Sequence, residues 1–460
     1  MYMAVGAYGG DVNCLHDAGY ARLYARSGTD WNMIQQINGT RSFDSLGPSL
    51  DLSHDGSMLI ISKSFGPVYM YELSSSSFLY ELVHTTNDIS ANEVSVSGDG
   101  MVVGVTSGFS SIGTRIFERI GDGFQQRGAD ISGYGRSSGI ALNYNGSIAI
   151  VGDHRWGSNT VWNIGRAGVF QWRDVNEDGS MEWVQMGSDI TGDADWDLLG
   201  DVGCVSITHD GLTVSVGAGG YDRSRGLVRV YNHDSISDTW KQIGIDLVGD
   251  NADDQFSKTS LSSDGTYLAV GTFGIGNYVR LFAKNGDNYE AVGETIISDG
   301  GRFGWSVDIS ADASALVVSS YTLDGNKGKV YLYDTFLSSS TPAPTSSSSL
   351  PPSLPESSVP AAFPTFSPSF VTAPPTISPS SSPSKVSPVN PTRDVTNPPS
   401  KQATNPPTLM LSTQTLKRKD KQNNTNICRN MSECKFISSR YFHFGVNSLC
   451  VFISKLLLLF

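Results

Sequence analysis

The segment from Asp174 to Glu182 has the spacing of a calcium-binding loop. It reads Asp-Val-Asn-Glu-Asp-Gly-Ser-Met-Glu, so Asp174, Asn176 and Asp178 offer oxygen atoms at alternating positions and Gly179 permits a sharp turn. This pattern resembles the first half of an EF-hand loop, with Glu182 able to complete the ligand shell, but a bidentate glutamate at position twelve is missing. The segment therefore predicts either a weak calcium site or a polar hairpin turn without an ion. No other cofactor is expected.

A second group of candidate residues combines acids with aromatic and arginine side chains in the longest loops of the chain. Side chains of these types bind sugars or peptides by stacking, hydrogen bonds and charge. We therefore predict a protein or carbohydrate ligand on one loop face, with a solvated and variable surface as the alternative. The predicted ligand-face residues are Arg155, Trp156, Trp162, Tyr221, Arg223, Arg225, Asp195, Asp197, Asp253 and Asp254.

The sequence offers little for nucleophilic catalysis, and no catalytic residue is nominated. Its seven histidines are scattered, and His54 and His209 fall in short turns. Paired carboxylates for glycoside hydrolysis could come from a central channel, but no pair stands out. We therefore expect a non-enzymatic binding or adhesion protein, and keep a carbohydrate-active hydrolase or lyase as an alternative.

An internal repeat must position these residues. Short strands that end on an aromatic residue recur at intervals of 46 to 59 residues along the first 335 positions. A period in this range, with several β-rich runs inside each unit, is typical of a β-propeller. The recurring aromatics are Tyr24, Tyr71, Phe117, Trp172, Tyr231, Phe282 and Tyr333, and we expect them at equivalent places in the third strand of seven blades.

Six of the seven units contain a turn of the type Ser-x-Asp-Gly, degenerate in the last, and it is followed by an almost continuously apolar run such as YLAVG at 267–271. Asp-Gly turns between apolar runs are strong hairpin signals, and continuous apolar runs fit strands covered on both faces. The fold class is therefore all-β, a seven-bladed β-propeller of about 48 residues per blade. The chain opens on a second strand, so the first blade is expected to be incomplete or to borrow another segment, and the N-terminus to be truncated.

The units resemble known propeller repeats. Phe303-Gly-Trp-Ser-Val307, followed by Ala315-Leu-Val-Val318, looks like the FG-GAP repeat of integrin-α-type propellers, and the Ser-x-Asp-Gly turn also resembles WD40 repeats. The resemblance implies the propeller architecture over residues 1–335. The resemblance does not imply a calcium loop of the FG-GAP type in this chain. Such a loop lies between the first and second strands of a blade, where this sequence has only the short Asp-Gly turn.

Beyond the propeller at 1–335, the composition changes twice. Residues 336–407 are rich in Ser, Pro and Thr, which predicts a disordered stalk or linker because such a segment buries too little apolar surface. Residues 408–460 are basic, with a short hydrophobic end that reads as a low-order tail; an anchoring role in a membrane is one interpretation of that end.

Charge is divided between these parts. The propeller carries 21 basic and 41 acidic residues, a formal net charge of −20, whereas the remainder of the chain carries 11 basic and 4 acidic residues, a net charge of +7. An acidic surface repels phosphate backbones, so we expect no nucleic-acid partner. We expect a monomer.

The compartment is predicted from weaker signals. Sequons at Asn38, Asn423 and Asn430 and the Ser/Pro/Thr-rich stalk favour a secreted or cell-surface glycoprotein, although the sequence has no visible signal peptide. The five cysteines show neither metal-ligand spacing nor an even framework. An intracellular WD40-like scaffold that docks partner peptides in the cytoplasm is the alternative.

Overall fold

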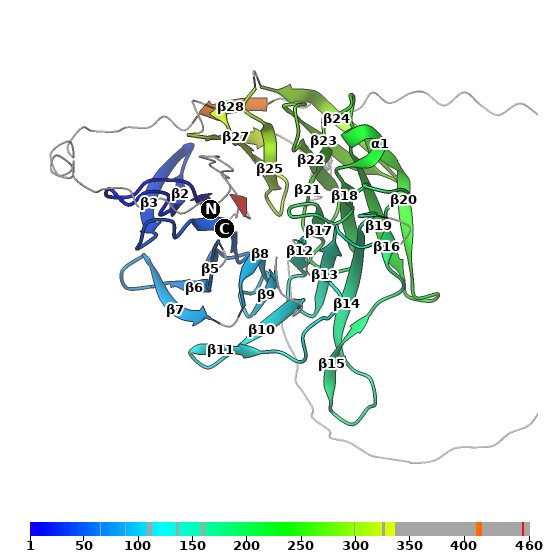
Figure 1. Ribbon diagram of the computed structural model, residues 1–460, viewed down its shortest axis with the longest axis horizontal. Coiled ribbons are helices and arrows are strands. Elements are labelled where there is room, and N and C mark those ends of the chain that lie inside the picture. Colours follow the sequence, from blue (N-terminus) through cyan, green and yellow to red (C-terminus); the bar gives the residue numbers. More distant parts are fainter. Residues whose placement is uncertain are drawn as a thin grey trace, which may run out of the picture. The chain divides into compact units, whose positions relative to one another are not determined.

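The computed structural model describes residues 1–335 except 65, 88, 108–112, 135–137, 158–161, 299 and 324–326, together with two short backbone strands at 411–415 and 453–454. Seven antiparallel sheets surround a central axis, which confirms the predicted seven-bladed propeller (Figure 1). The predicted stalk at 336–407 lies outside the described residues, and so does most of the tail. No helix in the described part is long and apolar enough to cross a membrane.

The strands of each blade run outward from the axis in chain order, and we name them a to d. Blades 1 to 3 are built from β1 (Tyr2–Ala7), β2 (Tyr20–Ser27), β3 (Asp30–Asn38); β4 (Leu46–Leu52), β5 (Met58–Lys63), β6 (Val68–Leu73), β7 (Tyr80–Thr86); and β8 (Ala91–Val96), β9 (Val102–Ser107), β10 (Thr114–Ile120), β11 (Gly123–Gln126). Blades 4 and 5 are built from β12 (Ile140–Leu142), β13 (Ile148–Asp153), β14 (Arg166–Asp174), β15 (Met181–Gln185), with β16 (Ile190–Thr191); and β17 (Val205–Ile207), β18 (Thr213–Ala218), the short turn α1 (Tyr221–Ser224), β19 (Leu227–Asp234), β20 (Thr239–Val248). Blades 6 and 7 are built from β21 (Phe256–Leu261), β22 (Tyr267–Thr272), β23 (Tyr278–Asn285), β24 (Asn288–Ile297); and β25 (Phe303–Ile309), β26 (Ala315–Ser320), β27 (Lys329–Thr335).

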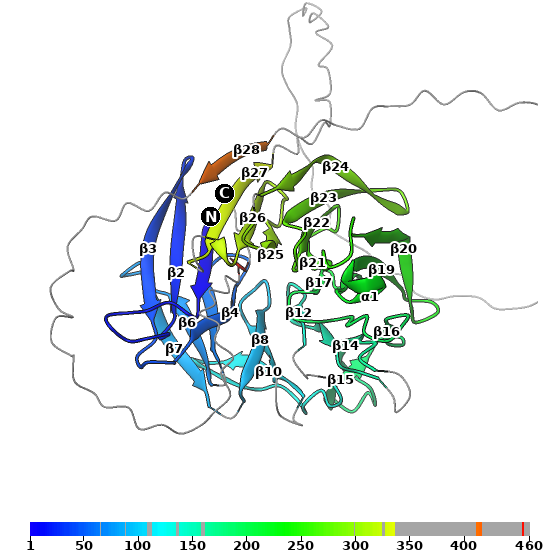
Figure 2. The same ribbon diagram turned by 45° about the horizontal axis from the view of Figure 1, so that its top comes forward.

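Two segments from the C-terminal part of the chain pair with the incomplete blades. β29 (Ile453–Ser454) pairs with β1 at the inner position of blade 1, and β28 (Leu411–Thr415) pairs with β27 at the outer position of blade 7 (Figure 2). The expectation that blade 1 would lack its own inner strand or borrow another segment is therefore confirmed.

Apolar packing between blades closes the ring. Each of the seven interfaces between neighbouring blades contains one cluster of buried apolar side chains in the described residues, including the interface of blades 7 and 1, where Met3 and Val5 pack with Val317. The b strands are buried along their whole length, as in β9 and β26, because a blade lies against each face.

The Asp-Gly turns repeat one hydrogen-bond pattern. At Ser262-Ser-Asp-Gly265, Ser262 Oγ donates to Asp264 Oδ1 over 2.8 Å and accepts the Tyr267 N–H over 2.9 Å, while Gly265 has φ +70°. The degenerate turn of blade 7 keeps this conformation although Ala313 replaces the glycine, with φ +56°. These turns lie together on what we call the turn face; the d-to-a and b-to-c connections lie on the opposite loop face.

The recurring aromatics all lie in c strands, but one is not at the equivalent place. Val103 pairs with Phe117 and Val214 pairs with Tyr231, each three residues after the turn glycine. In blade 4 the corresponding residue, Ala149, pairs with Phe170. The prediction was therefore wrong for Trp172, which lies two residues further along β14 and contacts Trp183, with ring centroids 5.4 Å apart.

Candidate active site at the channel mouth

The inner strands align on their turns, and this alignment reveals two rings of residues around the channel. Six segments of eight residues superpose without gaps: SLDLSHDG, EVSVSGDG, GIALNYNG, CVSITHDG, KTSLSSDG and SVDISADA. Their first position, nearest the loop face, forms what we call the mouth ring: Ser49, Glu93, Gly139, Cys204, Lys258 and Ser306. Their third position forms what we call the inner ring: Asp51, Ser95, Ala141, Ser206, Ser260 and Asp308.

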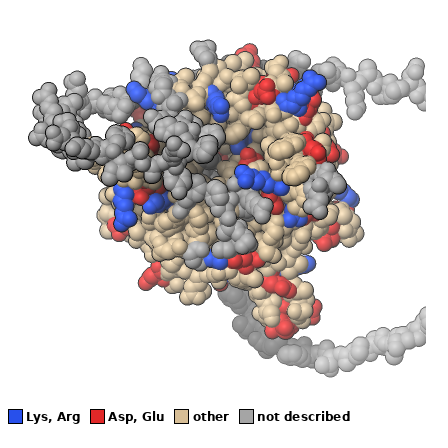
Figure 3. Space-filling view, viewed as in Figure 1, with Lys and Arg blue, Asp and Glu red and all other residues tan. Residues whose placement is uncertain are grey.

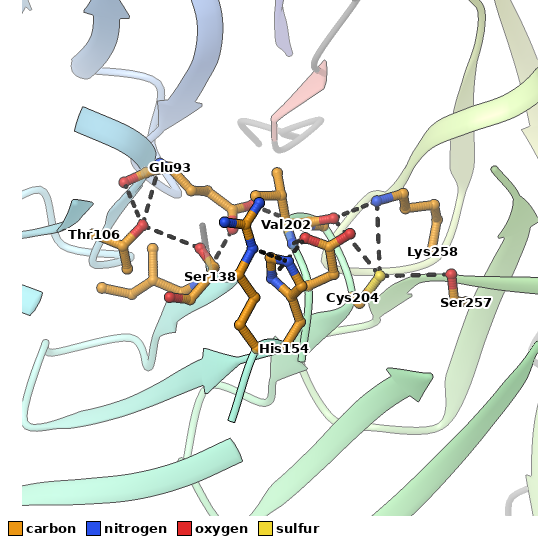
Figure 4. Close-up of polar contacts among 12 residues, drawn as sticks. Glu93, Thr106, Ser138, His154, Val202, Cys204, Ser257 and Lys258 are labelled. Atoms are coloured by element: carbon orange, nitrogen blue, oxygen red, sulfur yellow. Dashed lines mark hydrogen bonds and ion pairs between the residues drawn. The ribbon is translucent and has the colours of Figure 1, made fainter. Parts of the chain in front are cut away.

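The mouth ring contains chemistry that the turns do not. Its members differ from blade to blade, and Glu93, Cys204 and Lys258 bring a carboxyl, a thiol and an amine to one end of the channel (Figure 4). All three side chains are buried. A buried charge is costly unless it is paired, so such groups are retained either for inter-blade binding or for chemistry.

The short loop 201–204 before β17 is the centre of this arrangement. The Gly203 N–H donates to Glu93 Oε1 over 3.0 Å, Lys258 Nζ donates to the Val202 carbonyl oxygen, and the Cys204 thiol donates to Ser257 Oγ over 3.6 Å (Figure 4). Gly139 permits the loop to approach, because a Cβ there would lie 2.8 Å from the Asp201 carbonyl oxygen. Four consecutive loop residues thus connect blades 3, 4, 5 and 6.

Glu93 is held by backbone donors on two other blades. Its Oε2 accepts the Ile140 N–H over 3.1 Å, in addition to the Gly203 N–H at Oε1. Burial raises the pKa of Glu93 to about 8, and the Lys258 ammonium and the two N–H groups only partly oppose this rise. The carboxyl is therefore mostly protonated at neutral pH and positions loop 201–204.

Lys258 is a buried cation in contact with an aromatic face. Its Nζ lies 3.7 Å from Cys204 Sγ and 4.4 Å from the centroid of the Phe273 ring. Burial lowers the pKa of Lys258, but the nearby Cys204, Asp201 and Glu93 outweigh burial and raise it. The pKa of the Cys204 thiol rises to about 11 because the group is buried. Lys258 therefore stays charged, and Cys204 is a poor nucleophile.

His154 and Asp201 form a pair beside the ring. His154 Nδ1 lies 3.2 Å from Asp201 Oδ1, and Arg155 Nε donates to His154 Nε2 over 3.3 Å. His154 follows β13 on the loop face and is buried, whereas Asp201 is partly exposed. The contact meets the distance of an ion pair but lacks hydrogen-bond geometry at Nδ1. A histidine that hydrogen-bonds a carboxylate through Nδ1 is oriented as a general base, so a small rotation of either side chain would give this arrangement.

A cavity of about 160 Å³ lies below the ring. It is lined from the mouth by Glu93, Gly203 and Lys258 and from the turn face by His54 and His209. The volume is below the range of about 300–1,000 Å³ for pockets that hold drug-sized ligands. The cavity therefore suits a small polar molecule.

The predicted ligand-face residues lie on the loop face, but only Arg155 is joined to the mouth by a described contact, through His154. The Trp162 side chain is exposed, and the backbone N–H of this residue donates to Asp195 Oδ1 over 3.2 Å. Trp156 lies beneath the Arg166 guanidinium, 5.2 Å away. Tyr221 packs on the apolar cluster between blades 4 and 5.

The remaining members of that set serve the loops themselves. Asp197 and Asp254 are buried, and each carboxylate accepts two N–H groups of its own loop; Asp254, for example, accepts the N–H groups of Asp250 and Asn251. In each carboxylate a single oxygen, Oδ2, accepts both backbone N–H groups and so holds the loop; ligand binding by these two residues stays a prediction. Arg225 Nε donates to the Gly249 carbonyl oxygen, and the Arg223 carbonyl oxygen accepts the Asp253 N–H.

The calcium candidates lie at the hairpin of β14 and β15: Asp174 ends β14, Glu182 lies in β15, and Asn176 and Asp178 are exposed in the turn. Asp174 accepts the N–H groups of Asn176 and Gly179, and Asp178 accepts the Ser180 N–H over 2.9 Å. Hydrogen bonds to Ser180 lower the pKa of Asp178. These contacts describe the polar hairpin turn, and calcium binding by Asp174, Asn176, Asp178 and Glu182 stays a prediction.

The glycosylation candidates fall in different parts of the chain. Asn38 ends β3 with an exposed side chain, and its Oδ1 accepts a hydrogen bond from Gln36. Asn423 and Asn430 lie outside the described residues. Glycosylation at the three positions stays a prediction.

The face seen in Figure 3 carries basic and acidic side chains interspersed around the disc. Paired charges account for part of this distribution. Arg229 binds Asp193 and Asp246, and Arg280 binds Asp250. The arginines of the c strands thus neutralise acids of the d strands and their loops.

Comparison with known proteins supports the fold. No protein-family model and no curated protein sequence matches the chain. Among solved structures, a protein from Lactobacillus plantarum is 15% identical, with coverage of 73% of this chain and 92% of its own and a TM-score of 0.51. A candidate 6-phosphogluconolactonase from Bacteroides uniformis is 15% identical, with coverage of 72% and 91% and a TM-score of 0.50. The periplasmic gluconolactonase of Pseudomonas aeruginosa is 14% identical, with coverage of 72% and 92% and a TM-score of 0.48.

These comparisons contradict the expected non-enzymatic adhesion role. The Bacteroides uniformis propeller carries the name of a lactonase, an enzyme, so the hydrolase alternative agrees better with this finding. At these identities the likeness itself shows the fold alone. The FG-GAP resemblance is not specifically supported by these structures.

Proposed function

We propose that the protein is a carbohydrate-active hydrolase whose active site is the channel mouth, and that it opens a small sugar-derived ester such as a lactone. The observation that carries this proposal is the convergence of the Lys258 ammonium and the His154–Asp201 pair on loop 201–204. The name of the Bacteroides uniformis propeller suggests which substrate class to test first.

Each group has a role in ester hydrolysis. His154, with Asp201 at Nδ1, would take a proton from the attacking water at Nε2, once Arg155 moves from that nitrogen. The Lys258 ammonium would stabilise the negative charge on the tetrahedral oxygen. Glu93 is a positioning residue, because both its oxygens accept backbone N–H groups.

Ester opening suits the site better than glycoside cleavage. Glycosidases need two carboxyl groups that flank the scissile bond, one as an acid and one as a base or nucleophile. At this mouth Glu93 is enclosed by backbone donors and Asp201 faces His154, so neither carboxyl is placed to act directly on a sugar. A base and a cation remain, which is the set that acyl transfer requires.

The test is proton release from glucono-1,5-lactone and from 6-phosphogluconolactone, measured with the full chain against the spontaneous rate. We expect Lys258→Met to lower kcat/KM by about 10²–10³, the usual effect of removing one oxyanion donor. Lys284→Met, at an exposed lysine of β23, is the matched control and should retain the wild-type rate. A wild-type rate equal to the spontaneous one for both lactones would contradict the proposal.

The predicted compartment is also a proposal. We propose a secreted or cell-surface location, which is supported by the disulfide at Cys14, because disulfides persist in oxidising environments. The FG-GAP resemblance and the weak calcium site belong to the same extracellular interpretation. Peptide mapping under non-reducing conditions, with and without deglycosylation at Asn38, tests it.

A further inference from the structure

The inner ring joins neighbouring blades by a repeated hydrogen bond. A side-chain oxygen of one blade accepts the N–H of the next inner strand: Asp51 from Val96 over 2.8 Å, Ser95 from Leu142 over 3.2 Å, Ser206 from Leu261 over 3.0 Å and Ser260 from Ile309 over 3.2 Å. At these four interfaces the ring therefore pairs one backbone donor of each following blade.

Alanine interrupts this ring at the interface of blades 4 and 5. Ala141 stands at the position of Ser95 and Ser206, and the donor that corresponds to Leu142 and Leu261 is the Ile207 N–H. Ile207 pairs with Val214 in the register that Leu142 has with Ala149 and Leu261 has with Leu268. Its N–H therefore points away from β18 and toward Ala141, whose methyl group accepts no hydrogen bond.

A buried backbone donor requires an acceptor. Leaving an N–H without a partner costs about 1–3 kcal/mol, so such groups are paired in native proteins or turned toward water or ligand. Ile207 is buried, and both Ala141 and Ile207 line the cavity below the mouth ring. The acceptor for the Ile207 N–H therefore has to come from a molecule in the cavity.

We propose that Ala141 and the Ile207 N–H form a subsite, here called the blade-4 notch, that receives a hydroxyl or carboxylate oxygen of the ligand. This inference rests on the proposed function for its ligand class and deepens it. The notch lies two to three residues along the inner strands from the mouth ring, a depth of about 7–10 Å. A ligand that reaches both places enters end-on.

The chemistry of the channel wall indicates what enters. Ser95, Ser206 and Ser260 line the same cavity as the notch, and Lys258 offers a cation at the mouth. A linear polyhydroxy acid, the product class of sugar-lactone hydrolysis, matches a channel with a cation at its mouth and hydroxyl groups deeper inside. Its carboxylate would lie toward Lys258 and its hydroxyl end at the Ile207 N–H.

The test restores the ring. Ala141→Ser supplies the hydroxyl that the other blades have, so it should satisfy the Ile207 N–H and occupy the notch. We expect binding of sodium D-gluconate, measured by calorimetry on the full chain, to weaken at least 10-fold while the thermal midpoint does not fall. Ala141→Gly is the matched control: it leaves the notch open, and its affinity should stay within about threefold of wild type.

Hydrogen exchange at the Ile207 amide gives a second readout. Gluconate should slow exchange in the wild type, and Ala141→Ser should show slow exchange without gluconate. Absence of gluconate binding by the wild type, equal affinity of all three proteins, or equal loss in both variants would each overturn the notch. Binding that Ala141→Ser removes, in a protein without lactone hydrolysis, would keep the notch and reject the proposed function. If the protein hydrolyses a lactone and Ala141→Ser leaves the KM for that lactone unchanged, the proposed function would stand and the notch would be rejected.

Discussion

The two ends of the inner strands differ in how strictly they follow the repeat. At the turn face, six turns keep the same positive φ, the same side-chain hydrogen bonds and nearly the same residue types at three of their four positions, while the second position varies. At the loop face, the mouth ring changes from serine to glutamate, glycine, cysteine, lysine and serine within one turn around the axis. Repetition maintains the fold, whereas departures from it bring different functional groups to one place.

This difference predicts opposite consequences for substitutions at the two ends. Changes at the turn face should alter stability and leave ligand chemistry intact. Changes at the mouth should alter chemistry or its pH dependence. The following experiments examine this contrast in order of expected effect.

The largest expected effect is the pH dependence of stability that Glu93 causes. Its pKa is about 8 in the folded protein against an ordinary value of 4.5, so the native state holds a proton that the unfolded state releases. The free energy of unfolding should therefore fall as pH rises from about 4.5 to about 8. Glu93→Gln removes this titration, and chemical denaturation at several pH values should give a flatter profile for the variant. Parallel profiles for both proteins would contradict the assignment.

A smaller effect separates two neighbouring acids on the loop face. Asp254 is buried and accepts N–H groups from Asp250 and Asn251, whereas Asp253 is exposed. Asp254→Ala should cost about 3 kcal/mol, because charged hydrogen bonds are lost and buried donors stay unpaired. Asp253→Ala should cost only about 1 kcal/mol, the penalty of placing alanine at φ +65°. Urea denaturation compares them, and equal costs would show that the loop does not depend on the buried carboxylate.

The smallest effect concerns the turns. Gly265 has φ +70°, so Gly265→Ala should destabilise the protein by about 1 kcal/mol. Ala313 already has φ +56°, so Ala313→Gly should be neutral or slightly stabilising despite the entropy that glycine adds to the unfolded chain. Thermal midpoints of the two variants should move in different directions. A matching decrease would mean that the turn of blade 7 is not equivalent to the others.

Sequence predicted the fold well because its signals are local. The Asp-Gly turns, the apolar b strands and the spacing of the aromatics each depend on a few neighbouring residues, and together they predicted the seven blades. The error at Trp172 arose because β14 carries two aromatic residues, and only the pairing of Ala149 with Phe170 shows which is equivalent.

The site could not be predicted in the same way. Glu93 and Gly203 are 110 residues apart, and nothing in either local segment indicates that they meet. A signal did exist: when the eight-residue segments are aligned, their first position varies from blade to blade, as does the sixth position, which carries His54 and His209. Two of the predicted ligand-face acids, Asp197 and Asp254, share a loop-holding pattern with Asp44, which accepts the N–H groups of Thr40 and Arg41.

The most direct test of the central claim compares two histidines on opposite faces of the propeller. His154 lies beside Asp201 at the mouth, and His209 occupies a turn at the other end of the cavity. With the lactone that the wild type hydrolyses fastest, His154→Gln should lower kcat by at least about 100-fold, the usual scale for loss of a general base. His209→Gln should retain kcat within about threefold. Equal losses in both variants, or a larger loss at His209, would contradict an active site at the mouth.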